Sequence, residues 1–347
     1  MQTSPPRVLN GEAAGKQQLP SDEGSTPTSS SSPVRKALAK ERSFADPAFR
    51  TLVYLCAGAV LAIVGLIVYE LLIQSHLAIS KFGFKFLVKQ IWDPVNEDFG
   101  ALPFVYGTLV SSLLALVIAV PLSVGTALFL TEICPRALRS TMSLLVELLA
   151  AIPSVIYGLW GIFVLAPFLR KYVQPFLGSY FGWTGLFTGP KYGIGMLAAG
   201  VILAIMILPI IASITREVVL AVPQQQREAA LALGATKWEM LRMAVLRNAR
   251  PGILGGVILG LGRALGETMA VTMVIGNRPE IAKSLFAPGY TLASVIANEF
   301  TEATSAMYLS SLVEMALILF VLTLIVNALA GLLVWSITRG MPARALA

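Results

Sequence analysis

An arginine and a glutamate lie four residues apart inside the fifth long apolar segment of the chain. Arg263 is near the centre of residues 252–276, and Glu267 follows it by about one helical turn. A charge at the bilayer centre costs about 2.5–3.5 kcal/mol even on a lenient insertion scale, so something must compensate it. Glu267 can pair with Arg263, and the planar guanidinium can also donate a fork of hydrogen bonds to an oxyanion. The spacing therefore predicts either a structural ion pair or a transport pathway in which Arg263 binds an anion and Glu267 holds it in register when the site is empty.

Small residues recur every four positions along the same segment, at Gly252, Gly256, Gly260 and Ala264. On a helix this period makes a smooth stripe that a neighbouring helix can approach closely. The glycines around Arg263 depart from the spacing of a dinucleotide-binding fingerprint, and neither a preceding strand nor a ribose-binding carboxylate is visible. The stripe predicts a packing surface, and no cofactor is expected.

The connection at residues 222–250, which we call the docking loop, contains residues typical of the starts and ends of two short helices. Pro223 suits the first position of a helix, and Gly234 suits the left-handed residue that ends one. Thr236 followed by Glu239 is a capping box, in which each side chain satisfies a free backbone amide. We expect one helix over about 223–233 and a second from near Lys237 that stops before Pro251.

Three consecutive residues of the first of these helices, Glu228, Ala229 and Ala230, place small side chains on a short exposed surface. Small side chains allow another protein to approach the backbone closely. The pattern favours a docking element over an ordinary helical connection between two membrane spans.

Several kinds of chemistry have no counterpart in the sequence. There is no G-x4-G-K-[S/T] loop for ATP phosphates, no nucleophile elbow and no histidine-based zinc motif. The two cysteines, Cys56 and Cys134, provide neither a disulfide framework nor a cluster of metal ligands. We predict a protein that is not an enzyme and has no metal site, and that must obtain energy from a partner.

The elements that position these residues are long apolar helices. Only 13% of the 347 residues are charged and 56% are hydrophobic, whereas soluble domains carry about 25% charged residues. Because a bilayer core requires roughly 20 apolar residues in a helix, we predict an all-α polytopic membrane protein with six transmembrane helices. They are expected near residues 51–73, 104–131, 140–166, 194–220, 252–276 and 309–336. Pro121 and Pro153 predict kinks in the second and third of these helices.

The first 43 residues differ from the rest of the chain. They are rich in proline and serine and poor in branched apolar and aromatic residues, so they cannot bury enough surface to offset the entropy cost of ordering. We expect a disordered cytoplasmic tail at 1–43 and a six-span domain at 44–347. A cleaved signal peptide is not expected, because it would require an apolar stretch close to the N-terminus and none occurs before Thr51.

Basic residues indicate the orientation. With both termini inside, the predicted cytoplasmic segments hold 17 Lys and Arg and the outer segments hold eight. This asymmetry follows the positive-inside rule, so both termini are expected in the cytoplasm. The same asymmetry explains the net charge of +7, because the extra basic residues lie on the cytoplasmic side of the membrane. The charge therefore does not indicate a nucleic-acid partner, and none is expected.

Further charged residues lie in or beside the spans. Lys81, Lys85 and Lys89 recur every four residues beside apolar side chains, which suggests an interfacial helix and, less directly, a role in steering anions. Glu147 and Glu314 lie deeper in the spans, so each must face the bundle interior or a wet cavity. For these two acids structural pairing is favoured over transport.

The docking loop resembles the EAA loop of ABC-importer permeases through Glu228-Ala229-Ala230-x3-Gly234. In that superfamily this element inserts into a cleft of the ATPase subunit. The family pattern continues with Leu-Pro, and here Arg247 stands where that proline would be, so the family's local bend is not implied here, whereas its docking helix is.

Three other segments resemble the phosphate-specific (Pst) importer permeases of PstC type. They are residues 251–277 around Arg263, Trp92-Asp-Pro-Val-Asn with Phe99-Gly-Ala-Leu-Pro-Phe, and Ile152-Pro-Ser-Val-Ile-Tyr-Gly-Leu-Trp-Gly. The resemblance extends over nearly everything from about residue 50 onward. In this family an arginine and a glutamate of the fifth span are treated as transport residues, which here are Arg263 and Glu267.

The resemblance implies a type I ABC-importer permease fold and a place in a bacterial plasma or inner membrane. It implies a phosphate pathway formed with a second, homologous permease, two ATP-binding cassette subunits and an extracytoplasmic phosphate-binding protein, with membrane lipid around the spans. The alternatives are a permease for another oxyanion, such as sulfate, molybdate or phosphonate, and more distantly a secondary transporter or channel.

Overall fold

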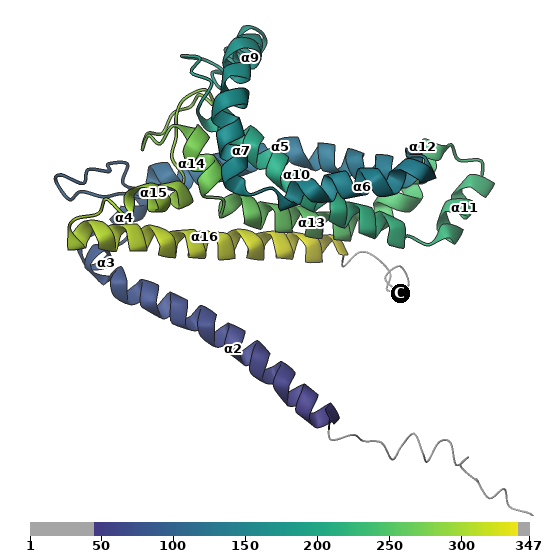
Figure 1. Cartoon of the computed structure of the whole chain (residues 1–347), viewed down its shortest axis with the longest axis horizontal. Helices are drawn as coiled ribbons and strands as arrows, with labels where there is room; N and C mark the ends of the chain where they lie inside the picture. The colour runs from purple at the N-terminus through teal and green to yellow at the C-terminus, as the bar shows by residue number, and fades with distance from the viewer. Residues whose placement is uncertain (1–44, 339–347) are drawn as a thin grey trace, which may run out of the picture. The chain divides into compact units, whose positions relative to one another are not determined.

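A computed structural model describes residues 45–338, and these residues are mostly helical, with no β-strand among them (Figure 1). Short π-helical stretches continue several of the helices, at Phe129–Ile133, Gly161–Leu165, Leu169–Val173 and Leu241–Leu246. The helices are α2 (Ala45–Gln74), α3 (His76–Phe82), α4 (Lys85–Val88), α5 (Leu102–Leu128), α6 (Arg136–Ala151), α7 (Ser154–Trp160), α8 (Ala166–Phe168), α9 (Gln174–Phe181), α10 (Met196–Ala221), α11 (Gln224–Ala232), α12 (Lys237–Met240), α13 (Arg247–Leu265), α14 (Met269–Ile275), α15 (Leu292–Glu299) and α16 (Ala306–Thr338).

The described part of the chain contains five helices that are long and apolar enough to cross a membrane, and a bent pair that makes a sixth if it is one span. The five are Phe49–Gln74, Leu102–Ile133, Ser154–Thr184, Met196–Ala221 and Ala306–Ser336, and the bent pair is Lys237–Leu265 with Met269–Ile275. The chain is therefore a multi-pass, all-α membrane protein, as the apolar runs predict.

The chain divides between Ala62 and Ile63 into two units. In the first, the described residues are the N-terminal part of α2, an apolar helix 30 residues long in all. The second unit, residues 63–347, contains the predicted functional residues of the spans and the docking loop. The predicted tail at 1–43 lies outside the described residues, and the predicted domain boundary at 44 stays a prediction.

Helix α10 is the centre of the second unit and packs against α5 on one side and α13 on another. The glycine stripe of α13 makes the second contact: a side-chain carbon at Gly252 would overlap Val218, one at Gly256 would press on Ile214, and one at Gly260 on Ile211. Those three partners belong to α10. The prediction that the stripe is a packing surface is confirmed.

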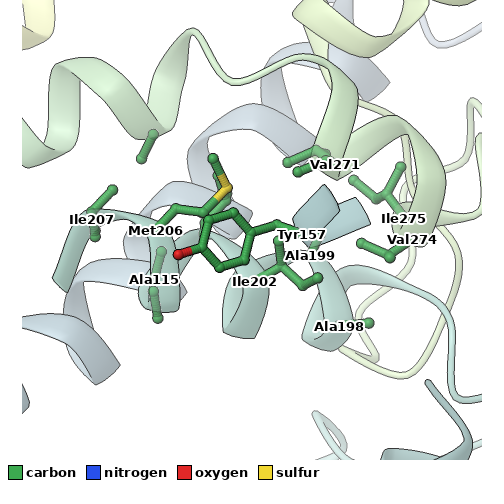
Figure 2. Close-up of a cluster of buried hydrophobic side chains, with 14 of the residues drawn as sticks. Ala115, Tyr157, Ala198, Ala199, Ile202, Met206, Ile207, Val271, Val274 and Ile275 are labelled. Carbon is green, nitrogen blue, oxygen red and sulfur yellow. The ribbon is translucent and has the colours of Figure 1, made fainter. Parts of the chain in front are cut away.

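A buried cluster joins α10 to α5, α7 and α14 (Figure 2). Ile202 and Ile207 of α10 pack with Ala115 of α5, and Tyr157 of α7 lies among them. Val271 and Ile275 add the buried face of α14. This cluster fixes the position of α14. It therefore also fixes residues 266–268, which connect α13 to α14.

The third span differs from the prediction of one kinked helix over 140–166. Helix α6 ends at Ala151, and a new helical stretch begins at Ser154 and runs to Thr184. Pro153 has no amide hydrogen and extends the backbone before it, which breaks the helix completely. The hydroxyl group of Tyr157 donates to the carbonyl oxygen of Leu149 at 2.7 Å and so bridges the break.

A second buried cluster lies at the end of the unit that carries α3, α4 and α15 (Figure 1). The ring of Trp92 contacts Phe99 at a centroid distance of 4.7 Å, and Phe99 stacks on Tyr308 at 5.4 Å. Glu299 accepts hydrogen bonds from Trp92 Nε1 at 2.8 Å and from the Tyr308 hydroxyl at 2.6 Å. The segment that resembles Pst permeases here is thus a structural joint between the loop, α15 and α16.

The loop of this joint is closed by Asp93. Its carboxylate accepts from the side-chain amide of Asn96 at 2.7 Å and from the backbone amides of Asn96 and Val95. The hydrogen bonds from Asn96 hold the pKa of Asp93 below its usual value. The turn places Val95 at its tip, where the side chain is 91% exposed.

The opposite end of the unit carries α11 and α12 (Figure 1). Helix α11 covers Gln224–Ala232, close to the predicted first helix of the docking loop, and the predicted capping box of Thr236 and Glu239 is formed at the start of α12. The second helix does not stop before Pro251, however. It continues through a π-helical stretch into α13, so Pro251 lies inside a continuous helix, where it removes one backbone hydrogen bond.

Candidate transport and docking sites

The fifth span is broken after Leu265, two residues beyond Arg263, which the sequence did not predict. Helix α13 ends at Leu265 and α14 starts at Met269, and their axes are bent by 64°. The expectation of one continuous helix over 252–276 is therefore wrong. The bend has a packing cause, because α14 turns its apolar residues into the cluster with α7 and α10 (Figure 2).

The break places Arg263 and Glu267 close together in different surroundings. The guanidinium Nη2 of Arg263 lies 3.7 Å from Glu267 Oε2, so the predicted pairing is present. The Arg263 side chain is 45% exposed, whereas that of Glu267 is only 7% exposed. Glu267 also accepts a long hydrogen bond of 3.5 Å from the backbone amide of Ala270, at the start of α14.

This geometry gives the two residues different capacities. The Glu267 carboxylate is buried in the protein, while the half-exposed guanidinium keeps donors that no side chain or carbonyl of residues 45–338 uses. A cation on a broken helix, supported by a buried acid, is an arrangement suited to binding an anion reversibly.

A further polar residue lies beside Gly262, the residue before Arg263. A side-chain carbon at Gly262 would lie 3.9 Å from the amide of Asn327 on α16, and the Oδ1 atom of Asn327 has no hydrogen-bond partner in the described part of the chain. Asn327 was not among the predicted site residues. A lone amide in the apolar run at 309–336 was the available signal, because polar groups inside spans usually face the bundle.

The four predicted residues of the docking loop lie on one exposed helix–turn unit. Glu228 and Ala229 are exposed on α11, Ala230 is half-buried, and Gly234 follows the helix with φ of +85°. The backbone amide of Gly234 donates to Leu231 O and that of Ala235 to Ala230 O, which closes the helix end. The predicted left-handed turn is confirmed, while the docking role stays a prediction.

An open groove of about 540 Å³ is lined by residues on both sides of this turn, including Ala229, Gly234 and Glu239. Large apolar side chains that the sequence analysis did not select stand beside it: Leu233 is 90% exposed and Trp238 is 64% exposed. Exposed apolar residues on a polar loop were the signal, because such surface usually marks an interaction site.

Three polar contacts fix α11 of the docking loop to the neighbouring long helices, and none of them was predicted from the sequence. Arg227 of α11 pairs with Glu132, in the π-helical extension of α5, and its Nη2 donates to the carbonyl oxygen of Val219 at 2.6 Å. The side-chain amide of Asn248, in α13, hydrogen-bonds to Gln226. The loop is thus connected at once to α5, α10 and α13.

The two other acids predicted inside the spans, Glu147 and Glu314, differ in whether they form an ion pair. Glu147 of α6 pairs with Arg216 of α10 at 3.2 Å, and Arg216 also donates to the Ser143 hydroxyl at 2.9 Å. The structural role predicted for Glu147 is therefore present. Glu314 has no such ion pair within the described ranges. Among these residues no group of three or more acids, histidines or cysteines is arranged to hold a metal ion.

A family model described as "Binding-protein-dependent transport system inner membrane component" matches residues 119–339. The chain is 52% identical to the phosphate transport system permease protein PstC of Mesorhizobium japonicum over 300 residues, which is 85% of this chain and 92% of that one. It is 46% identical to the PstC of Pasteurella multocida, over 84% of this chain and 90% of the other.

Solved structures are similar in fold. A bacterial alginate ABC transporter, crystallised with an alginate-pentasaccharide-bound periplasmic protein, has a chain that aligns with a TM-score of 0.57 and 17% identity, covering 84% of this chain and 96% of that one. A second crystal structure, of a bacterial ABC transporter involved in alginate import, gives a TM-score of 0.56. These likenesses place the helices in the ABC-importer permease fold.

Proposed function

The chain belongs to the family of binding-protein-dependent transport system inner membrane components, and we propose that it is the permease subunit of an ATP-driven importer of inorganic phosphate. The observation that carries the proposal is the 52% identity to a phosphate transport system permease over 85% of the chain. At such identity, over nearly the full length of both proteins, the same substrate class is the simplest expectation. The chain is itself a transport subunit and makes no bond.

The complex in which it acts contains other subunits of the same transport system. We expect a second, homologous permease beside this one, two ATP-binding cassette subunits on the docking loops and an extracytoplasmic phosphate-binding protein on the opposite face. The greater number of Lys and Arg on the side of the docking loop supports a cytoplasmic location for that loop and for both termini. The end that carries Val95 and α15 then faces outward.

Arg263 is the residue expected to bind phosphate within the membrane. Its half-exposed guanidinium can donate two parallel hydrogen bonds to a phosphate oxygen pair, and Glu267 takes up those donors again once the anion has left. The distance of 3.7 Å between the two side chains is long for a strong ion pair. Little energy is therefore needed for Arg263 to exchange Glu267 for phosphate as its partner. Release and rebinding of the arginine can therefore alternate in each cycle.

Movement would reach this site through the docking loop. Closure of the ATP-binding subunits would shift α11, and the contacts of Arg227 and Gln226 would carry that shift to α5 and to the start of α13. Because α13 runs from that contact to the break at Gly266, a rigid displacement of the helix would move Arg263 relative to α14. This sequence of contacts links ATP hydrolysis to exposure of the anion site on alternate faces.

The proposal is tested by transport in membrane vesicles that contain the complete transporter. We expect ATP-dependent uptake of labelled phosphate that an excess of unlabelled phosphate abolishes and an excess of sulfate or molybdate leaves nearly unchanged. Uptake of sulfate in place of phosphate would assign the complex to another oxyanion. Uptake that persists without ATP-binding subunits would instead identify a secondary transporter or channel.

A further inference from the structure

An apolar groove runs along α16 beside the connection between α3 and α4. It encloses about 460 Å³, and its walls include Phe84, Leu87 and Val105 opposite Val321 and Ile325 of α16. From the level of residue 314 to that of residue 325 it follows the helix for about 16 Å, at 1.5 Å per residue. The groove is therefore long enough for much of an extended hydrocarbon chain.

One polar side chain, Glu314, interrupts the apolar lining near one end of this groove. The residue is only 7% exposed, and its Oε2 atom has no hydrogen-bond partner within residues 45–338. A buried carboxyl group without a partner is unfavourable, so a group that hydrogen-bonds to it is expected at this point. The ligand must combine an apolar chain with a polar group at its end.

Positive charge gathers on the other side of α4. Phe84 and Leu87 line the groove, whereas Lys81, Lys85 and Lys89 line a second cavity of about 490 Å³. Lys89 pairs with Asp98, and Lys81 donates to the backbone carbonyl oxygen of Glu97 at 3.0 Å. Lys85 has no ion pair within 4 Å in the described part of the chain, so this surface keeps an excess of positive charge.

We propose that the two cavities together bind one anionic phospholipid, with its phosphate at the lysines of the 81–89 segment and one acyl chain in the groove of α16. The Glu314 carboxyl group, in its protonated form, then donates a hydrogen bond to an ester carbonyl oxygen of the lipid, which lies between the phosphate and the acyl chains. The inference requires only that the chain crosses a membrane and does not depend on the identity of the transported anion.

Charge and shape together favour this ligand over the two other possible occupants. Free inorganic phosphate could use the lysines but would leave the groove and Glu314 without a partner. An apolar helix of another subunit could cover the groove, but it would offer nothing to the lysines beside it. A phospholipid with a net negative headgroup satisfies all three features, because basic residues near a bilayer surface attract anionic lipids.

The test uses the full-length chain, stripped of lipid and purified in detergent, and counts bound lipids by native mass spectrometry. Phosphatidylglycerol and phosphatidylcholine with identical acyl chains are added in turn. We expect phosphatidylglycerol to bind better, and Lys81→Gln/Lys85→Gln/Lys89→Gln to remove at least about fivefold of that affinity, the amount typical of one basic residue at a membrane surface. The matched control Arg170→Gln/Lys171→Gln/Lys191→Gln should retain it.

The groove is tested separately by filling it. Val321→Trp should abolish binding of both lipids, whereas Leu329→Trp, on an exposed part of α16 outside the groove, should not. Glu314→Leu should weaken both lipids equally, and Glu314→Gln, which can still donate a hydrogen bond, should weaken them less. Equal binding of the two lipids to the unaltered chain, or full retention in Val321→Trp, would overturn the proposal.

Two further measurements do not depend on folding of the variants. A phosphatidylglycerol with a photoreactive acyl chain should label the 314–325 segment of the unaltered chain above all other segments. Uniform labelling along every span would identify ordinary surrounding lipid and contradict a specific site. Displacement of the bound lipid by excess inorganic phosphate would assign the lysines to the free anion instead.

Discussion

At the scale of single residues, Arg263 and Glu267 differ in ways that their spacing alone does not reveal. The arginine is half-exposed and the glutamate is almost buried, so the two ends of one ion pair are not equivalent. Sequence analysis could predict that the pair forms, because residues four apart meet on a helix. It could not predict that the glutamate lies in a helix break, because Gly266 and Thr268 continue an apolar run without any proline.

Substitutions at this pair should therefore have unequal effects. We predict that Arg263→Gln lowers phosphate uptake per inserted complex by at least about tenfold, because a charge-assisted hydrogen bond contributes about 1.5–3 kcal/mol. Arg263→Lys should recover only part of the activity, since an ammonium group lacks the planar fork. Glu267→Gln should reduce uptake less, because binding persists and release slows.

The double substitution separates a transport role from a structural one. Arg263→Gln/Glu267→Gln leaves no unpaired charge in the span, so a purely structural pair would be largely rescued by it. A residue that binds the anion would not be rescued, because its donors are still missing. Uptake of labelled phosphate, normalised to the amount of complex in the membrane, distinguishes the two; substantial recovery in the double variant would refute contact with the substrate.

At the scale of elements, several features that depend on neighbouring residues were predicted correctly, whereas those that depend on distant residues were not. The glycine period of α13, the capping box of α12 and the left-handed Gly234 depend on a few neighbouring residues, and all are present. The break between α13 and α14, in contrast, depends on where buried side chains of α14 find partners. The pairing of Arg227 with Glu132 joins residues 95 apart in the chain, and only the folded structure brings them together.

That ion pair should transmit motion from α11 to α5. Removing one partner alone would leave a largely buried charge, so we predict the effect of Arg227→Met/Glu132→Met, which replaces both by apolar groups of similar length. The ATP-binding subunits should still bind, but phosphate transported per ATP hydrolysed should fall. The control Arg216→Met/Glu147→Met removes a more exposed pair, worth about 1 kcal/mol or less, and should retain coupling. Equal coupling in both variants would exclude transmission through Arg227.

The turn at Gly234 offers a second test of the docking loop. A side-chain carbon there would meet no other atom within 4 Å, so a substitution acts only through the backbone, whose φ is +85°. We predict that Gly234→Val weakens binding of the ATP-binding subunit and stimulated ATP hydrolysis, because a β-branched residue is strained in this conformation. Gly234→Asn should preserve both, since asparagine tolerates the left-handed region. Normal assembly and hydrolysis in the valine variant would contradict a coupling role.

At the scale of the whole molecule, the two ends of the second unit are expected on opposite sides of the membrane. Each end presents a nearly fully exposed apolar side chain: Val95 is 91% exposed in the loop before α5, and Leu233 is 90% exposed after α11. In a background of Cys56→Ser and Cys134→Ser, a single cysteine at either position can report which side it faces. The similar exposure of the two sites makes their reactivities comparable.

We predict that Val95→Cys reacts with a membrane-impermeant maleimide in intact cells, whereas Leu233→Cys reacts only after the membrane is permeabilised. The basis is the excess of Lys and Arg on the side of the docking loop, which the positive-inside rule assigns to the cytoplasm. Labelling is measured by the shift in mass of the purified chain, in cells that lack added ATP-binding subunits so that Leu233 is not covered. The reverse pattern would invert the topology and would place the docking loop where no ATP-binding subunit could reach it. Because the proposed path of force runs from that loop through α13 to Arg263, such a result would also exclude ATP-driven transport by this route.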